Sequence, residues 1–222
     1  MPIPRSYHHG GVRHTAITVG LAAAREGGVN AVTVREVTRR IGVSPNAVYR
    51  HFADHRALVV AVALEAQEKL AETMRARIAA LTDGLEGTDA AVAQLRGVGL
   101  GYIEFALAEP GWFETALLTF DPQAGGEVPT VEVDAAIPAP FQLLLDALDA
   151  CVATGAMAAE VRPGAEWPCW SAVHGFADIA TRGPLKGHDS ATLAAMGERV
   201  VEAIVRGVQA STQRSANAVR IR

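Results

Sequence analysis

The chain has 222 residues and a formal net charge of −4, with 50% of its residues hydrophobic and 20% charged, a composition that supports a packed core and excludes disorder for the bulk of the chain. No apolar run approaches the roughly 18 residues of a membrane span, and the first residues, MPIPRSYHHGG, lack the apolar segment of a signal peptide. We therefore expect a cytoplasmic protein of one large or two small domains, without membrane contact.

The charge is distributed unevenly along the chain. Residues 1–54 hold seven Lys and Arg side chains against three acids, a charge of +4, whereas the remainder holds 13 against 21, a charge of −8. Five histidines also lie in or just beyond the basic segment: His8, His9, His14, His51 and His55. A basic head on an acidic body predicts that only the head meets a polyanion, although chance clustering of charge in a short segment is the alternative.

The two cysteines, Cys151 and Cys169, have no Cys or His neighbour at the spacing of metal ligands. A disulfide is disfavoured in the cytoplasm. We interpret both cysteines as buried small apolar residues and expect neither a metal nor a cofactor.

The first helix is expected over residues 12–26, where Ile17, Leu21 and Ala24 follow helical spacing and Gly27-Gly28 ends the run. The segment TVREVTRRIGV then predicts a second helix. Thr33 and Glu36 have the spacing of a capping box, in which each side chain satisfies the backbone amide of the other residue.

A short turn separates this second helix from a third. Gly42 can adopt the positive φ of a sharp helix exit. Ser44 can then cap a new helix that has Pro45 in its first position. A connection of about three residues forces the two helices to cross steeply, as in a helix-turn-helix.

Helical periodicity dominates the remaining chain. The expected helices cover about 54–81, 89–108, 111–120, 141–152, 169–183 and 190–210, and the segment DPQAGGEVPT at 121–130 is the most loop-like. No alternating strand pattern and no repeat is present. We predict an all-α fold of about nine helices, divided into a helix-turn-helix domain at 8–55, a larger helical domain at 56–212, and a frayed tail at 213–222.

The third helix, 44–51, is predicted to enter the major groove of DNA, which alone admits a helix and displays a distinct pattern for each base pair. Val48 and Phe52 would be its buried side. The outward residues suit base edges or phosphates: Ser44, Asn46, Ala47, Tyr49, Arg50 and His51. Thr33 and Arg35, at the start of the second helix, can hold a further phosphate. A plain αα-corner would explain the capping, but neither the basic excess nor the exposed aromatic residue.

Residues 7–58, which contain YHHGGVRHTAI and AAAREGGVNAVTVREVTRRIGVSPNAVYRHFADHRAL, resemble the DNA-binding domain of the TetR family of bacterial transcription regulators. The resemblance implies a homodimer with a helical C-terminal domain that binds a small molecule. It places these residues on DNA-contact positions: Thr33, Arg35, Ser44, Asn46, Ala47, Tyr49 and His51. Arg50 falls on a variable position that often reads bases. His55 replaces the family's usual phosphate-binding lysine, which implies a weaker or pH-dependent contact.

The segment WSAVHGFADIATRGPL resembles a Trp…His-Gly helix found in one C-terminal subgroup of this family. That resemblance implies that this helix and the last one form a four-helix bundle between two subunits. Ala172, Ala177 and Ala180 are small enough for close helix approach. The alternative is that both helices only build the core of the monomer.

An effector pocket is expected where the aromatic residues concentrate: Tyr102, Phe105, Trp112, Phe113, Phe120, Phe141 and Trp170. His174 is the candidate polar group of this pocket, with a satisfied core histidine as the alternative. For each aromatic residue, ordinary core packing is the alternative. An apolar and aromatic lining favours an apolar or aromatic effector. Binding of this effector is expected to shift the helix at 54–81 and separate the two DNA-reading heads of a repressor.

Two other classes of function are weighed against this hypothesis. An enzyme could use His8, His9 and His14 as metal ligands, or His174 with Asp178 as a catalytic pair, but the three N-terminal histidines lack an acidic or Cys partner and a His-x-x-x-Asp pair is common on solvated helix faces. We therefore expect no enzymatic activity. A DNA-binding protein without small-molecule control is the second alternative, and the acidic body argues against a purely architectural role.

Overall fold

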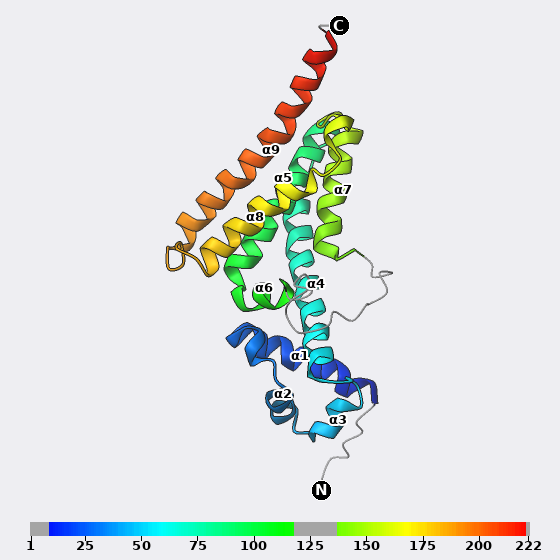
Figure 1. Ribbon diagram of the computed structural model, residues 1–222, viewed down its shortest axis with the longest axis vertical. Helices are drawn as coiled ribbons and strands as arrows, with labels where there is room; N and C mark the ends of the chain where they lie inside the picture. Colours follow the sequence, from blue (N-terminus) through cyan, green and yellow to red (C-terminus); the bar gives the residue numbers. More distant parts are fainter. Residues whose placement is uncertain (1–8, 118–136, 221–222) are drawn as a thin grey trace. The chain divides into compact units, whose positions relative to one another are not determined.

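The computed structural model describes residues 9–117 and 137–220, with only the backbone described for 9, 10 and 211–220 (Figure 1). Within these residues the chain forms nine α-helices and no strand, which confirms the predicted all-α fold. The helices are α1 (His9–Gly27), α2 (Val34–Ile41), α3 (Pro45–Tyr49), α4 (His55–Thr82), α5 (Gly87–Ala108), α6 (Pro110–Leu117), α7 (Ala139–Ala153), α8 (Glu166–Thr181) and α9 (Ser190–Arg220), with 3-10 turns at Val29–Ala31 and Ala159–Val161.

The helices are divided into two compact units. The first unit contains Met1–Glu68 and Glu109–Ala135, and the second contains Lys69–Ala108 and Ala136–Arg222. The expected division near residue 55 differs from this one because the first part of α4 and the whole of α6 belong with α1–α3. The loop expected at 121–130, Phe120 and His8 lie outside the described residues.

The first unit is built on one apolar core shared by α1, α2, α3, the start of α4 and α6. Its members are buried: Ala16, Leu21, Ala24, Val32, Val37, Val48, Phe52, Leu58, Val62, Ala66 and Ala116. Leu58, Val62 and Ala66 recur every four residues on α4, so one face of that helix completes the core. Gln67, also buried, donates from Nε2 to the carbonyl of Ala116 over 3.0 Å, which ties α4 to α6.

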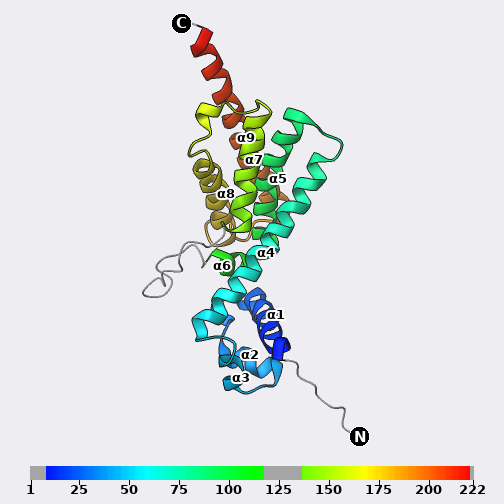
Figure 2. The same ribbon diagram turned by 90° about the vertical axis from the view of Figure 1, so that its right-hand side faces the viewer.

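The second unit is centred on α5, which contacts α7, α8 and α9 (Figure 2). Ten residues of α5 are buried, among them Leu95, Val98 and Tyr102. The last helix continues to Arg220, beyond its expected end near residue 210. The segment STQRSANAVR contains neither Gly nor Pro, so nothing in its backbone chemistry ends the helix there.

Candidate nucleic-acid interface and ligand cavity

The start of α2 is half of the capping box that the sequence predicts. Thr33 is the N-cap, and its Oγ1 accepts a hydrogen bond of 3.1 Å from the backbone amide of Glu36. The amide of Thr33 donates to the carbonyl of Ala31 over 3.0 Å. The reciprocal bond from Thr33 to the Glu36 carboxylate was therefore a wrong expectation, because that carboxylate is bonded to arginine side chains instead.

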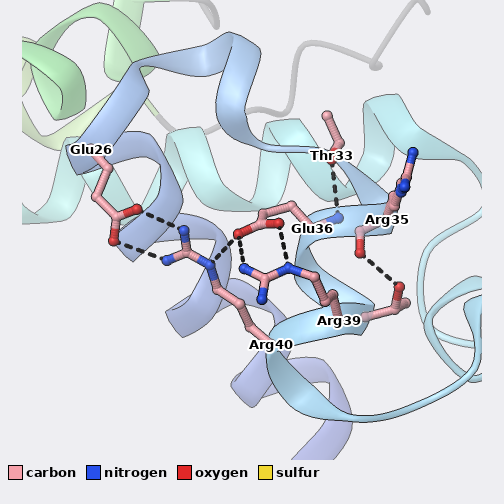
Figure 3. Close-up of polar contacts among 7 residues, drawn as sticks. Glu26, Thr33, Arg35, Glu36, Arg39 and Arg40 are labelled. Atoms are coloured by element: carbon pink, nitrogen blue, oxygen red, sulfur yellow. Dashed lines mark hydrogen bonds and ion pairs between the residues drawn. The ribbon is translucent and has the colours of Figure 1, made fainter.

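Glu36 stands at the centre of an ion-pair network on the surface of α1 and α2 (Figure 3). Arg39 donates to both carboxylate oxygens of Glu36, over 2.9 and 2.7 Å, and Arg40 Nε donates to Oε1 over 2.6 Å. These hydrogen bonds, first from Arg39 and then from Arg40, lower the pKa of Glu36 to about 2. The guanidinium of Arg40 also donates to both oxygens of Glu26, over 3.0 and 2.6 Å, and so joins α2 to α1.

The turn between α2 and α3 has the predicted backbone conformation. Gly42 has φ 76°, a left-handed value, and its amide donates to the carbonyl of Thr38 over 2.9 Å. Ser44 is the N-cap of α3 and Pro45 its first residue, as expected. The hydroxyl of Ser44 makes no capping bond, however, and the carbonyl of Ser44 accepts from the amide of Ala47 over 3.0 Å.

Helix α3 separates a buried face from an exposed polar one. Val48 is fully buried and Phe52, in the following turn, is 4% exposed. Of the six DNA-contact residues predicted at 44–51, four are exposed: Ser44, Asn46, Tyr49 and Arg50. Ala47 and His51 are half-buried beside them. The arrangement has the two faces that a DNA-reading helix requires: one side anchored in the core and the other presented outward.

His55, expected only as a phosphate contact, also makes a hydrogen bond within the first unit. Its Nε2 lies 2.7 Å from the carbonyl oxygen of Val32, the residue that precedes the N-cap Thr33. A carbonyl oxygen only accepts, so Nε2 carries the proton of this bond. The imidazole therefore ties the first residue of α4 to the start of α2, a structural contact that the sequence did not indicate.

The charges of the basic head are partly compensated within the first unit. Arg25 is paired with Glu109, and Arg39 and Arg40 are paired with Glu36 and Glu26. Arg35 and Arg50 are exposed and, over the part of the chain that the structure describes, neither has an ion-pair partner. These two arginines carry the outward charge of α2 and α3.

The second unit contains an apolar cavity with a volume of about 20 Å³, measured as the space open to the centre of a water molecule. The cavity is therefore narrow as it stands. Its wall is supplied by α4, α5, α7, α8 and α9. The lining residues are Met74, Leu95, Val98, Gly99, Tyr102, Pro140, Leu144, Cys169, Trp170, Val173, Val201, Ile204 and Val205.

An aromatic cluster with one polar pair borders this cavity. The hydroxyl of Tyr102 lies 3.0 Å from Nδ1 of His174, and the imidazole stacks on Trp170 with ring centres 6.2 Å apart. Phe141 meets Trp170 edge-on with ring centres 5.5 Å apart. Burial lowers the pKa of His174 from its ordinary value and raises the pKa of Tyr102. Both groups are thereby held in their neutral forms.

The predicted effector residues do not all lie in one place. Tyr102 and Trp170 line the cavity, whereas Phe105 is buried but is not part of the lining. Trp112 and Phe113 belong to α6 in the first unit, where Trp112 Nε1 donates to the carbonyl of Leu21 over 2.7 Å. Aliphatic residues of α5 and α9 form a further part of the wall, and their helical spacing was the only signal for them: Leu95, Val98, Val201, Ile204 and Val205.

A second apolar surface, a groove, lies along α8, α9 and the turn Ala159–Val161. It shares Cys169 and Ile204 with the cavity wall. Ala172 is half-buried in the groove, but Ala177 and Ala180 are buried inside the unit. Burial raises the pKa of Cys169 to about 11, so its thiol stays protonated near neutral pH.

A capped α2, a left-handed glycine turn and an α3 with an exposed polar face together define a helix-turn-helix, the module of DNA-binding transcription regulators. Residues 17–62 match the family described as bacterial regulatory proteins, tetR family, and residues 95–204 match the tetracyclin repressor-like C-terminal domain. The chain belongs to the TetR family of DNA-binding transcription regulators.

Solved structures share this fold over most of the chain. A Rhodococcus sp. RHA1 protein of unknown function is 22% identical with a TM-score of 0.70, covering 93% of this chain and 100% of its own. The transcriptional regulator FadR from Bacillus subtilis, in complex with stearoyl-CoA, is 15% identical with a TM-score of 0.64, covering 88% and 98%. A tetR-family regulatory protein from Rhodococcus RHA1 is 18% identical with a TM-score of 0.51, covering 90% and 96%. The comparison with curated proteins gave no match.

None of the described helices is both long enough and apolar enough to span a membrane.

Proposed function

We propose that this regulator is a ligand-responsive repressor that binds a palindromic operator as a homodimer and releases it when a small apolar effector binds. The observation that carries this proposal is the exposed polar face of α3. Asn46 and Arg50 can read base edges there, while Tyr49 and Ser44 can donate to phosphates. Two such helices on a two-fold axis would read two half-sites one helical turn apart.

The DNA contacts that we propose include the start of α2. Thr33 and Arg35 are exposed beside the first amides of that helix, where a phosphate is favoured by the helix dipole. Ala47 and His51 flank the reading face. His55 donates from Nε2 to the carbonyl of Val32, so a phosphate contact would need a second N–H, at Nδ1.

Dimerisation through α8 and α9 is supported by the apolar groove. Met157, Pro168, Ala172, Val200 and Val208 line it together with Ala203, which is exposed. A second copy would remove this surface from water. We expect Ala203→Glu to give a monomer by light scattering and to weaken operator binding. Ala195→Glu places the same charge on α9 outside this groove and should leave the dimer intact. A monomeric wild-type protein would refute this part.

The effector that we propose is apolar because none of the described residues that line the cavity is charged. The structural neighbour FadR was crystallised with stearoyl-CoA, which supports a test of acyl compounds first. Entry of a chain of that kind requires the narrow cavity to widen. Helix α4 contributes Met74 to the cavity and Leu58 to the core of the first unit, so residues of one helix belong to both the effector cavity and the helix-turn-helix unit.

The decisive experiment selects the operator from a random DNA pool and then measures thermal stability and operator affinity with fatty acids, stearoyl-CoA and aromatic compounds. We expect an apolar compound to raise the melting temperature and weaken operator binding. If the selected DNA binds but no compound changes either quantity, the protein is a DNA-binding regulator without small-molecule control.

An enzymatic role is not supported by an assembled site. Asp178 accepts a hydrogen bond of 2.7 Å from Arg182 Nε, and His174 is bonded to Tyr102. In the described ranges, no group of three His, Cys, Asp or Glu side chains could hold a metal ion. Of the three N-terminal histidines, only the His14 side chain lies in the described region, where it is exposed.

A further inference from the structure

The carboxylate of Glu36 holds two arginines that differ in how firmly they are fixed. Arg40 has a second carboxylate partner, Glu26, and its side chain is 26% exposed. Arg39 has Glu36 as its ion-pair partner in the structure and its side chain is 67% exposed. If Arg39 leaves, Glu36 Oε1 keeps the hydrogen bond from Arg40 Nε. Arg39 can therefore leave the network while both carboxylates, Glu26 and Glu36, keep an arginine partner.

The position of Arg39 on α2 places it on the side of the proposed DNA contacts. It follows Arg35 by four residues, so the two side chains lie about 40° apart around the helix axis. Arg40 lies a further ~100° around the axis, on the side of Glu26 and α1 (Figure 3). Arg35 and Arg39 therefore share one exposed face of α2, one turn apart.

The pairing of Arg39 with Glu36 is weak enough to be exchanged. Water screens this ion pair because the Arg39 side chain is mostly exposed, and holding two long side chains together costs conformational entropy. A DNA phosphate offers the same bidentate geometry to a guanidinium. When the guanidinium binds DNA, it displaces counterions condensed on the phosphates. Their release favours the exchange of Glu36 for a phosphate at low salt.

We propose that Arg39 contacts a DNA phosphate in the complex and is paired with Glu36 while the protein is free of DNA. Glu26, Glu36, Arg39 and Arg40 together are neutral, so the free protein does not present Arg39 as an uncompensated cation. On the operator, Arg39 turns from Glu36 to the backbone phosphate next to the one held by Arg35. The inference rests on the proposed DNA interface and adds a contact to it.

The salt dependence of DNA affinity tests this directly, because each phosphate contact contributes about 0.9 to the slope of log affinity against log salt. The measurement uses the full-length protein and an operator selected from a random DNA pool. We expect Arg39→Gln to lower the slope by about 0.9 for each bound subunit and to weaken all DNA sequences alike. Arg25→Gln removes an equal charge from α1, where Arg25 is paired with Glu109. This control variant should change the slope much less.

Glu36→Gln tests whether Glu36 competes with DNA for Arg39, since the amide keeps the side-chain shape and removes the competing charge. We expect tighter DNA binding from this variant, and no such gain when Arg39→Gln is already present. An unchanged slope for Arg39→Gln, with a reduced slope for Arg35→Gln, overturns this inference and leaves the DNA interface standing. Unchanged slopes for both variants overturn the proposed interface as well. Melting curves show whether each variant is folded under the conditions of the DNA-binding measurement.

Discussion

Trp112 is fastened to the carbonyl of Leu21: its indole Nε1 donates a hydrogen bond of 2.7 Å to that oxygen. The guanidinium of Arg25, one turn further along α1, lies 5.1 Å from the centre of the same ring and also pairs with Glu109. Helix α6 is thereby fixed to α1 by a hydrogen bond, a cation–π contact and an ion pair. A tryptophan expected to line an effector pocket is instead part of the DNA-binding unit.

This contact predicts the effect of Trp112→Phe on stability. Phenylalanine keeps an apolar ring but cannot donate to the Leu21 carbonyl, and a lost neutral hydrogen bond costs about 1 kcal/mol. We expect the free energy of unfolding to fall by about 1–2 kcal/mol when measured with urea. Trp167→Phe is the matched control, because Trp167 is 60% exposed. Equal losses for both variants would show that the hydrogen bond to Leu21 is not the cause.

Two glycines on α5 allow α4 to approach closely, which gives a second prediction. A Cβ atom on Gly97 would lie 2.7 Å from Cα of Ile78, and one on Gly101 would lie 2.7 Å from Cα of Met74. Both obstacles are backbone atoms, which cannot move aside as a side chain can. We expect Gly97→Ala and Gly101→Ala each to lower the free energy of unfolding by about 1–3 kcal/mol through overpacking.

Gly175→Ala is the internal control for this seam. Gly175 lies within α8, and a Cβ atom there meets nothing within 4 Å. Alanine is the better helix former, so this variant should gain up to about 1 kcal/mol. Thermal melts of the three variants compare the same chemical change at helix positions that differ in the room around an added Cβ atom. Equal shifts at all three positions would contradict the close α4–α5 approach.

The sequence predicted backbone features better than it predicted the partners of long side chains. Periodicity and local rules indicated nine helices, the left-handed Gly42 and the position of Pro45, because these depend on neighbours in the chain. The partners of Glu36, His55 and Trp112 depend on which groups the fold brings within reach. Glu36 could bond Thr33 or either of two arginines at helical spacing, and nothing in the local pattern decides among them.

The pocket illustrates the same limit. Four of the predicted pocket residues, Tyr102, Phe141, Trp170 and His174, lie in the second unit, whereas α6, which follows α5 directly, places Trp112 in the first unit. The apolar wall of the cavity comes from ordinary helix stripes, which look like core in any sequence.

Burial of His174 predicts a pH dependence of stability. Burial lowers its folded-state pKa below 6.5, partly offset by the charge of Asp178. The unfolded state therefore takes up a proton first as the pH falls, so the stability present above pH 6.5 declines between 6.5 and the lower folded pKa. We expect His174→Gln to flatten this part of the pH profile of unfolding free energy. His188→Gln removes an exposed histidine and serves as control; equal flattening by both would remove His174 as the source.

Arg50 and Tyr49 lie side by side on the exposed face of α3 and should fail in different ways. If Arg50 reads a guanine edge, Arg50→Ala should relax the preference at one operator position by about 1–3 kcal/mol. Tyr49→Phe removes only a hydroxyl that can reach a phosphate, so it should weaken operator and random DNA by a similar factor. Affinities for the selected operator, single-base variants and random duplex separate the two cases. Equal loss on operator and random DNA for Arg50→Ala would move Arg50 from base reading to phosphate contact. Specificity would then rest on Asn46 and Ala47, the remaining side chains of that face that can meet a base edge.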